Sequence, residues 1–225
     1  MESNNEKVSA AEATEDIAAT KQPEVVEPVK LHDRPQVPES RRRTMWLAKM
    51  GVMLAVSVLI SFIPTPPILP AVPFIRYEFS DIPLLIGTFA FGVPSGVLLA
   101  FLSIALNALL GGAESALYGA LMHMIAIGVY IIVAGFIYRS KKNKKRAIIG
   151  LCAGTLAMTI VMIPANLLVT PIFMKAFMGS PQAVVDMIVP LLWKAIVPVN
   201  LIKGFVSALL VFLLYKRISP FLHKW

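Results

Sequence analysis

Long hydrophobic runs separated by short polar stretches dominate the chain from residue 46 onward. Six such segments can be traced, at residues 46–63, 81–91, 94–110, 116–138, 147–173 and 189–215. About 20 apolar residues are needed to cross a bilayer as a helix, and only the segment at 81–91 is far below that length. We expect that segment to be either a half-helix or a short span. The pattern predicts an all-α, polytopic membrane protein with six transmembrane helices.

Composition also indicates a membrane protein and argues against several other classes of protein. Hydrophobic residues make up 57% of the chain, charged residues make up 15%, and the mean hydropathy is +0.73, which is too apolar for a soluble domain. The formal net charge of +8 does not indicate nucleic-acid binding, because the basic residues lie next to hydrophobic segments. Cys152 is the single cysteine, which excludes an intrachain disulfide and a cysteine metal site.

The positions of the basic residues predict the orientation. Basic clusters precede the first segment, follow the fourth and follow the sixth, at 41–43, 139–146 and 216–224. Cytoplasmic loops of membrane proteins are enriched in Lys and Arg, so six spans with both termini inside place all three clusters in the cytoplasm. The loops on the outer face would then be residues 64–80, 111–115 and 174–188.

Residues 1–40 differ in character from the rest of the chain. They carry nine acidic and four basic residues, and four prolines interrupt any helical stripe. We expect this segment to be a disordered cytoplasmic tail and residues 41–225 to form the membrane domain. The tail contains no apolar run of the kind that a cleavable signal sequence requires, so none is expected.

Lys203 is the most informative single residue, because it interrupts the sixth hydrophobic segment. A lysine in the middle of a spanning helix costs roughly 2.5–3.5 kcal/mol and usually faces a site or a cavity. Asn200 lies one turn earlier on the same face, and Asn166 with Thr170 supplies further polar groups in the fifth segment. Two amides and a cation suit a ligand with an edge of alternating donors and acceptors. The competing interpretations are that Lys203 extends to the membrane surface and that the asparagines join helices.

The stretch between the first two segments is rich in proline and aromatic residues. It is too hydrophobic for an idle solvent-exposed loop, and residues 73–79 alternate as a short strand does. The stretch either folds over a pocket as a lid or lies at the membrane interface. Ser80 or Asp81 is expected to cap the helix that follows, with Pro83 in its first turn.

Three motifs in register resemble a known family. They are residues 77–97 (YEFSDIPLLIGTFAFGVPSGV), 166–174 (NLLVTPIFM) and 198–204 (PVNLIKG). Together they resemble the riboflavin-specific S components of energy-coupling-factor transporters, and the resemblance covers about residues 45–220. It implies a six-helix, multi-pass subunit of the bacterial plasma membrane. Such a subunit captures riboflavin from outside as a transported ligand and has no cofactor.

The resemblance also implies residue roles. Carried over by motif, the contacts to the flavin ring fall on the fifth and sixth helices at Asn166, Asn200 and Lys203. The first loop and the start of the second helix would cover the ligand with Phe74, Tyr77, Asp81 and Thr88.

The first helix carries Gly51 and Ala55, a pair of small residues four apart that allows close helix approach. The resemblance implies that this face docks a transmembrane coupling protein, which acts with two cytoplasmic ATPases. The alternative is a contact with another helix of the same chain. The chain has no phosphate-binding loop of the Walker type, so ATP would be used elsewhere.

One feature departs from the family pattern, since residues 99–107 are largely apolar until Asn107, where many relatives carry polar residues. His123 is a further polar residue, within the fourth segment. The third helix could therefore signal another heteroaromatic vitamin or a flavin derivative such as FMN or a roseoflavin-like compound. His123 is interpreted as a satisfied core histidine. An enzyme is not expected, because the spans hold no acidic residue away from their ends and no catalytic or metal-binding motif.

Overall fold

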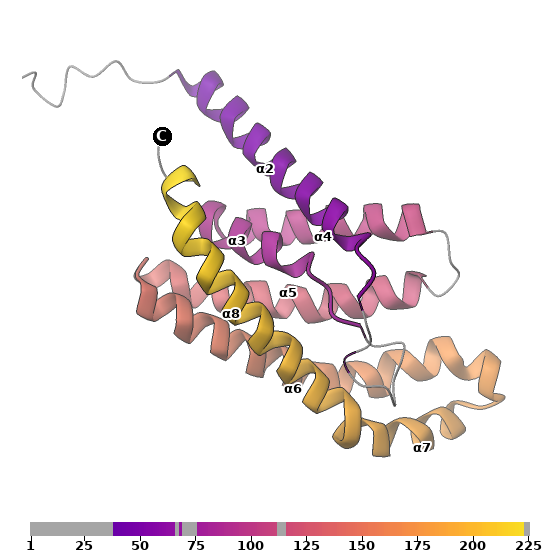
Figure 1. Ribbon diagram of the computed structural model, residues 1–225. Helices are drawn as coiled ribbons and strands as arrows, with labels where there is room; N and C mark the ends of the chain where they lie inside the picture. The colour runs from indigo at the N-terminus through magenta and orange to yellow at the C-terminus, as the bar shows by residue number, and fades with distance from the viewer. Residues whose placement is uncertain (1–37, 66–67, 69–75, 112–115, 223–225) are drawn as a thin grey trace, which may run out of the picture. The chain divides into compact units, whose positions relative to one another are not determined.

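The computed structural model describes residues 38–65, 68, 76–111 and 116–222, and its regular elements are all helices (Figure 1). Most of the predicted tail, at residues 1–37, lies outside the described residues, as does Phe74. The elements in chain order are α2 (Glu39–Ser61), α3 (Asp81–Phe91), α4 (Val93–Gly111), α5 (Ala116–Ser140), α6 (Lys144–Met178), α7 (Pro181–Leu191), the π-helical stretch η2 (Leu192–Ile196) and α8 (Val197–Leu222).

The helical fold agrees with the hydrophobic pattern. Five stretches in the described part of the chain are long and apolar enough to cross a membrane, and α3 is the shorter apolar helix that the sequence predicts. One expectation was wrong, since the predicted outer loop at 174–188 is mostly helical. There α6 continues to Met178 and α7 begins at Pro181.

Three consecutive residues explain the break between α6 and α7. Gly179 ends α6 with φ of 76°, a conformation that favours glycine. Ser180 then caps α7, since its Oγ accepts a hydrogen bond from the backbone N–H of Ala183 at 3.2 Å. Pro181 occupies the first helical position, where its missing N–H costs nothing.

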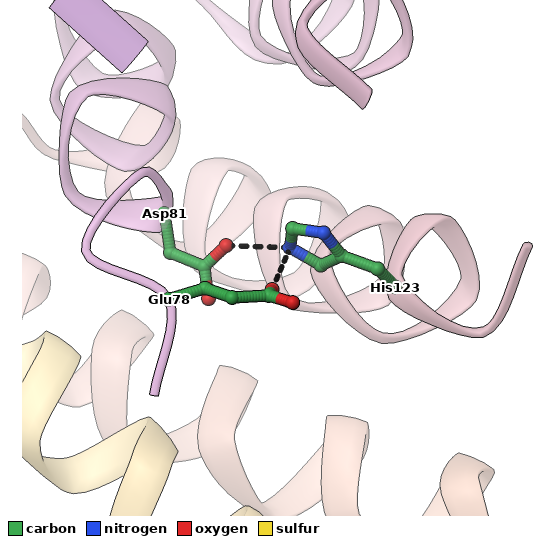
Figure 2. Close-up of side chains that lie close together, drawn as sticks. All are labelled: Glu78, Asp81 and His123. Atoms are coloured by element: carbon green, nitrogen blue, oxygen red, sulfur yellow. Dashed lines mark hydrogen bonds and ion pairs between the residues drawn. The ribbon is translucent and has the colours of Figure 1, made fainter. Parts of the chain in front are cut away.

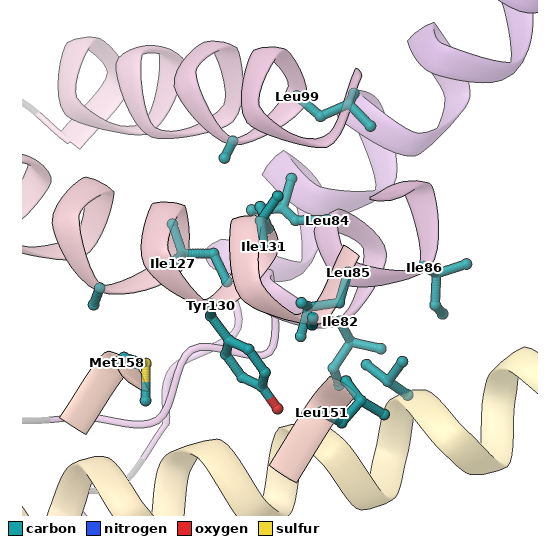
Figure 3. Packing of buried hydrophobic residues seen from close by; sticks show 14 of the residues in the cluster. Ile82, Leu84, Leu85, Ile86, Leu99, Ile127, Tyr130, Ile131, Leu151 and Met158 are labelled. Carbon is teal, nitrogen blue, oxygen red and sulfur yellow. The ribbon is translucent and has the colours of Figure 1, made fainter. Parts of the chain in front are cut away.

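The short helix α3 forms the centre of the packing (Figure 3). Residues 81–89 are all buried, and α3 packs against α4, α5 and α8. A helix enclosed on every side needs no polar face, which explains why its sequence is apolar all round. The core around it includes Leu84, Leu85, Leu99, Ile131 and Leu151, each at most 3% exposed.

Glycines allow the helices around α3 to approach closely. A Cβ on Gly96 of α4 would lie 2.0 Å from Thr88 Oγ1, and a Cβ on Gly204 of α8 would lie 2.4 Å from Thr155 Cγ2. Tyr130 of α5 strengthens the second crossing, since its hydroxyl donates to the Gly204 carbonyl at 3.0 Å. The turn of α8 that carries Lys203 is therefore fixed against α5 and α6.

Polar contacts join α2 to α4. Ser57, which is fully buried, donates to the carbonyl of Ser80 at 3.1 Å and lies 2.8 Å from the hydroxyl of Ser103. One turn further, Ser61 donates to the side-chain oxygen of Asn107. Asn107, the polar residue that interrupts the apolar third segment, thus bonds α4 to α2.

Prolines shape the two longest segments. Pro164 and Pro171 lie inside α6, as candidate sites of bending. Pro198 lies just after η2, and its missing N–H cannot bond the Lys194 carbonyl as a regular α-helix requires. The wider π turn ends instead with the Val197 N–H bonded to Leu192 O.

The outward faces of the long helices are apolar. Leu59, Leu109, Ile160, Leu168 and Leu209 are each at least 59% exposed. In water such surfaces would be unfavourable, whereas hydrocarbon accommodates them while the helices satisfy their own backbone groups. The structure therefore fits a lipid environment.

Candidate functional site

Lys203 lies in an ion-pair cluster at the start of α3. Its Nζ lies 2.9 Å from Glu78 Oε2 and 3.5 Å from Asp81 Oδ2. The lysine side chain is 13% exposed. The alternative in which Lys203 extends to the membrane surface is therefore wrong, because its ammonium is paired inside the protein.

His123 of α5 joins the same two carboxylates (Figure 2). Its Nε2 lies 2.8 Å from Glu78 Oε2 and 2.7 Å from Asp81 Oδ1. An ionised carboxylate can only accept hydrogen bonds, so Nε2 must carry the proton. The four residues Glu78, Asp81, His123 and Lys203, here called the ion cluster, connect the start of α3 to α5 and α8.

The two carboxylates of the ion cluster differ in exposure. The Asp81 side chain is 4% exposed and belongs to the first turn of α3, whereas Glu78 is 40% exposed and precedes the helix. Burial alone would raise the pKa of the Glu78 carboxyl, but the positive charges of His123 and Lys203 outweigh burial and hold it well below its usual range. Glu78 therefore stays ionised far into acid.

A cavity of about 570 Å³ lies beside the ion cluster. Its walls come from the end of α2, the segments 62–65 and 76–80, and the facing parts of α4 and α5. Glu78 and His123 are among the lining residues, together with Ser61, Asn107 and Arg76. Lys203 and Asp81 do not line the cavity, so they lie behind their two partners.

Tyr77 connects the cavity wall to α8. Its hydroxyl lies 2.9 Å from Ser207 Oγ, and its ring contacts Phe79 edge-on at 4.7 Å between centroids. Burial raises the pKa of the Tyr77 hydroxyl, so it stays protonated as a hydrogen-bonding group. Tyr77 thus presents an aromatic side chain beside Glu78.

The two predicted asparagines are bonded within their own helices. Asn166 donates to Met162 O and Asn200 donates to Ile196 O, both at 2.8 Å. Asn166 is buried, and its side-chain oxygen accepts a hydrogen bond from the Thr170 hydroxyl at 3.5 Å. The Thr170 hydroxyl also contacts the Tyr118 hydroxyl of α5. Hydrogen bonds do not link either asparagine to Lys203 in the described part of the chain.

Thr88 lies within the helix packing. It is 2% exposed, its hydroxyl donates to Leu84 O at 2.8 Å, and it faces the glycines that bring α4 and α5 close to α3. Of the seven predicted ligand contacts, the structure brings Lys203 and Asp81 together directly. Tyr77 lies near them because it precedes Glu78 in the chain, and Glu78 contacts Lys203.

Glu78, Asp81 and His123 have the chemistry of metal ligands. One ligand atom from each lies within 4.8 Å of the others. The Lys203 ammonium already pairs with both carboxylates, and its positive charge opposes a second cation at the same oxygens. The arrangement therefore suits a charge-balanced cluster better than a metal centre.

Sequence reasoning missed Glu78 and assigned His123 only a core role. His123 is indeed satisfied by hydrogen bonding, yet it also lines the cavity. The signal for Glu78 was present, since a lysine buried in a membrane protein needs a carboxylate and Glu78 lies one helical turn before Asp81.

Comparison with known proteins identifies the family. The chain matches the family described as "ECF transporter, substrate-specific component" over residues 46–215. The chain belongs to this family. The match begins within α2 and ends in α8, so it includes every helix that contributes to the ion cluster and the cavity.

Several curated proteins are similar over most of the chain. "Riboflavin transporter RibU" of Staphylococcus aureus is 31% identical, covering 79% of this chain and 92% of the relative. "Riboflavin transporter RibU" of Streptococcus thermophilus is 27% identical, covering 80% and 86%. "Riboflavin transporter FmnP" of Bacillus subtilis is 25% identical, covering 69% and 83%.

A solved structure shares the fold. It is described as "Structure and mechanism of the S component of a bacterial ECF transporter", and it aligns with a TM-score of 0.65 at 30% identity. The alignment covers 80% of this chain and 99% of the other. The apolar helices and these relatives make the chain a multi-pass protein of the bacterial plasma membrane, similar to transporter subunits and not to enzymes.

Proposed function

We propose that this S component binds riboflavin at the outer face of the membrane and delivers it for uptake driven by separate ATPases. The main support is that the chain is similar, over 79–80% of its length, to proteins named riboflavin transporters. The cavity supports it, because its volume suits a flavin-sized ligand and Tyr77, Glu78 and His123 line it. Lys203 lies behind this wall, paired with Glu78.

Lys203 is the donor we assign to the ligand. Riboflavin has a planar ring with carbonyl acceptors on its pyrimidine-like edge, and an ammonium can donate to such groups. Asn200 lies one turn away on α8 and is partly exposed, so its amide can extend the polar edge. Tyr77 supplies an aromatic surface, and contacts of that kind add about 0.5–1.5 kcal/mol beyond buried area.

Six spans with both termini in the cytoplasm fit this function. His123 lies in the third turn of α5 and Lys203 in the second turn of α8, whereas the basic clusters lie at the far ends of these helices. With the basic clusters inside, the ion cluster lies toward the outer face. Ligand would then enter from outside.

The partners we propose are a transmembrane coupling protein and two cytoplasmic ATPases. Gly51 and Ala55 are both exposed, and a Cβ on Gly51 would meet no atom within 4 Å. The small-residue face of α2 is therefore open in this chain and suits close approach by a partner helix.

Binding to a panel of vitamins tests the function. The detergent-purified protein is titrated with riboflavin, FMN, thiamin and biotin while protein tryptophan or flavin fluorescence is followed. The proposal predicts saturable quenching by riboflavin at submicromolar concentration and none by thiamin or biotin. Preference for FMN over riboflavin would assign a phosphorylated flavin instead, and binding of a non-flavin vitamin alone would contradict the proposal.

A further inference from the structure

Lys203, the proposed donor, already has a partner in this structure. Lys203 Nζ is bonded to Glu78 Oε2 at 2.9 Å, and Glu78 lines the cavity whereas Lys203 does not. A ligand that enters the cavity therefore meets the Glu78 carboxylate before the ammonium behind it. For a carbonyl of the ligand to reach Lys203, Glu78 must move aside.

Glu78 is the partner that can move. Asp81 is 4% exposed and belongs to α3, which is buried along 81–89, so its carboxylate is fixed behind the cavity. Glu78 is 40% exposed and precedes the helix. Its backbone carbonyl accepts a hydrogen bond from the Asp81 N–H at 3.3 Å, so it is the Glu78 side chain that can move. Asp81 can keep Lys203 charge-balanced while Glu78 leaves.

His123 provides a second partner for the departing carboxylate. Its Nε2 already lies 2.8 Å from the same Oε2 atom that contacts Lys203, and it also lines the cavity. Moving Glu78 off Lys203 therefore leaves the carboxylate with a hydrogen-bond partner. The same Nε2 atom also lies 2.7 Å from Asp81 Oδ1, and this contact keeps the His123 ring in place.

We propose that the Glu78–Lys203 pair must open before a riboflavin carbonyl can reach Lys203, and that His123 retains the Glu78 carboxylate when the carbonyl takes its place. Glu78 and His123 thereby control the rate of ligand entry without donating to the ligand themselves. This inference rests on the proposed function, since it takes Lys203 as the donor to the flavin. It assigns a role to the two residues that the motif comparison left unassigned.

The test is the association rate of riboflavin, followed by flavin fluorescence after rapid mixing with detergent-purified protein. The variants are Glu78→Gln, His123→Gln and the double variant. Asp186→Asn is the matched control, because it removes another carboxylate with a side-chain hydrogen bond, to Gln182 at 3.0 Å on α7. Thermal unfolding of each variant confirms that it is folded.

The proposal predicts a specific pattern of rates. Glu78→Gln should bind riboflavin about two- to fivefold faster than the unaltered protein, as expected for losing a partly exposed ion pair. His123→Gln should bind more slowly, because Glu78 then has Lys203 as its cation. The double variant should bind as fast as Glu78→Gln, since His123 acts through Glu78, and Asp186→Asn should not differ from the unaltered protein.

Other results would overturn it. Equal or slower association in Glu78→Gln would show that Glu78 does not block Lys203, and slowing by His123→Gln in the Glu78→Gln background would show that His123 contacts the ligand itself. If Glu78→Gln does not fold, Glu78→Asp serves instead, because its shorter side chain withdraws the carboxylate from Lys203. Failure of the folded, unaltered protein to bind riboflavin removes the proposed function as well, whereas normal binding with unchanged rates removes this inference alone.

Discussion

Glu78 Oε2 and Lys203 Nζ lie 2.9 Å apart although 125 residues separate them in the chain. The contact joins the segment before α3 to α8, and it forms between a carboxylate at the cavity wall and an ammonium behind it. A lysine in an otherwise apolar segment is thereby charge-balanced without reaching the membrane surface. The same lysine is the donor that we assign to riboflavin.

Replacing Lys203 with Met should destabilise the protein, because Asp81 would keep a buried carboxylate without its lysine. Removing one partner of a buried pair costs about 3–5 kcal/mol when the other charge is left alone, and the loss should be smaller here because His123 still contacts Asp81 at 2.7 Å. The double variant Lys203→Met/Asp81→Asn should recover part of that loss, since the remaining charge is also removed. Thermal unfolding in detergent measures both, and a double variant less stable than Lys203→Met would contradict the pairing.

The stabilisation from Glu78 should depend on pH in acid. Its folded pKa is lowered by His123 and Lys203, so the pairing contributes fully above the unfolded pKa of about 4.5 and is lost as pH falls through the folded pKa. The unaltered protein should therefore unfold at a higher temperature than Glu78→Gln near pH 7, by a small margin because the pair is partly exposed. This difference in unfolding temperature should shrink below pH 4.5. A difference that grows in acid would contradict a stabilising role for the ionised Glu78 carboxylate.

Gly204→Ala should weaken both stability and ligand binding. Its Cβ would lie 2.4 Å from Thr155 Cγ2, which forces α8 away from α6 at the turn that carries Lys203. Overpacking of this kind costs about 1–3 kcal/mol. Gly128→Ala is the control, since no atom lies within 4 Å of its added Cβ and alanine favours a helix. Thermal unfolding and riboflavin titration of the two variants compare the effects, and equal behaviour would argue against the tight crossing.

A large side chain at Gly51 should prevent assembly with partner proteins and leave riboflavin binding unchanged. Gly51→Trp leaves the ion cluster untouched, so riboflavin titration should be unchanged. The same variant should fail to co-purify with the proposed coupling protein and ATPases, because the bulky side chain would keep a partner helix from approaching α2 closely. Ile160→Trp is the control, since this residue of α6 is 64% exposed but lies outside the small-residue face of α2. Normal assembly of Gly51→Trp would place the docking surface elsewhere.

Much of the fold follows from the hydrophobic pattern. Residues 81–91 form α3 with the predicted bounds, and Ser80 occupies the cap position, although its side chain makes no capping hydrogen bond there. The pattern could not reveal that α3 is enclosed by other helices, because a fully buried helix and a short span are equally apolar. The helix α7 was overlooked although Gly179, Ser180 and Pro181 mark a stop and a start.

The site was predicted only in part, because sequence spacing reports neighbours within a helix but not partners across helices. Lys203 could be singled out from the sequence because a charged residue in a membrane-spanning helix has a high free-energy cost. Its contacts with Glu78 and with Asp81 span more than 120 positions, and His123 reaches both carboxylates from a third helix. Asn166 lies on the same helix face as Thr170, whose hydroxyl donates to its side-chain oxygen. The role of Asn166 and Asn200 in binding a ligand stays a prediction.

Titration of riboflavin into the unaltered protein, Lys203→Met and Lys194→Met tests whether Lys203 donates to the ligand. Lys194 lies on η2, nine positions before Lys203, and is exposed, so its replacement removes the same charge outside the ion cluster. Calorimetry on folded samples should give tight binding to the unaltered protein and to Lys194→Met, with at least about tenfold weaker binding to Lys203→Met, as loss of a charged hydrogen bond predicts. Equal affinity in all three proteins would contradict the assignment of Lys203 as the donor to riboflavin.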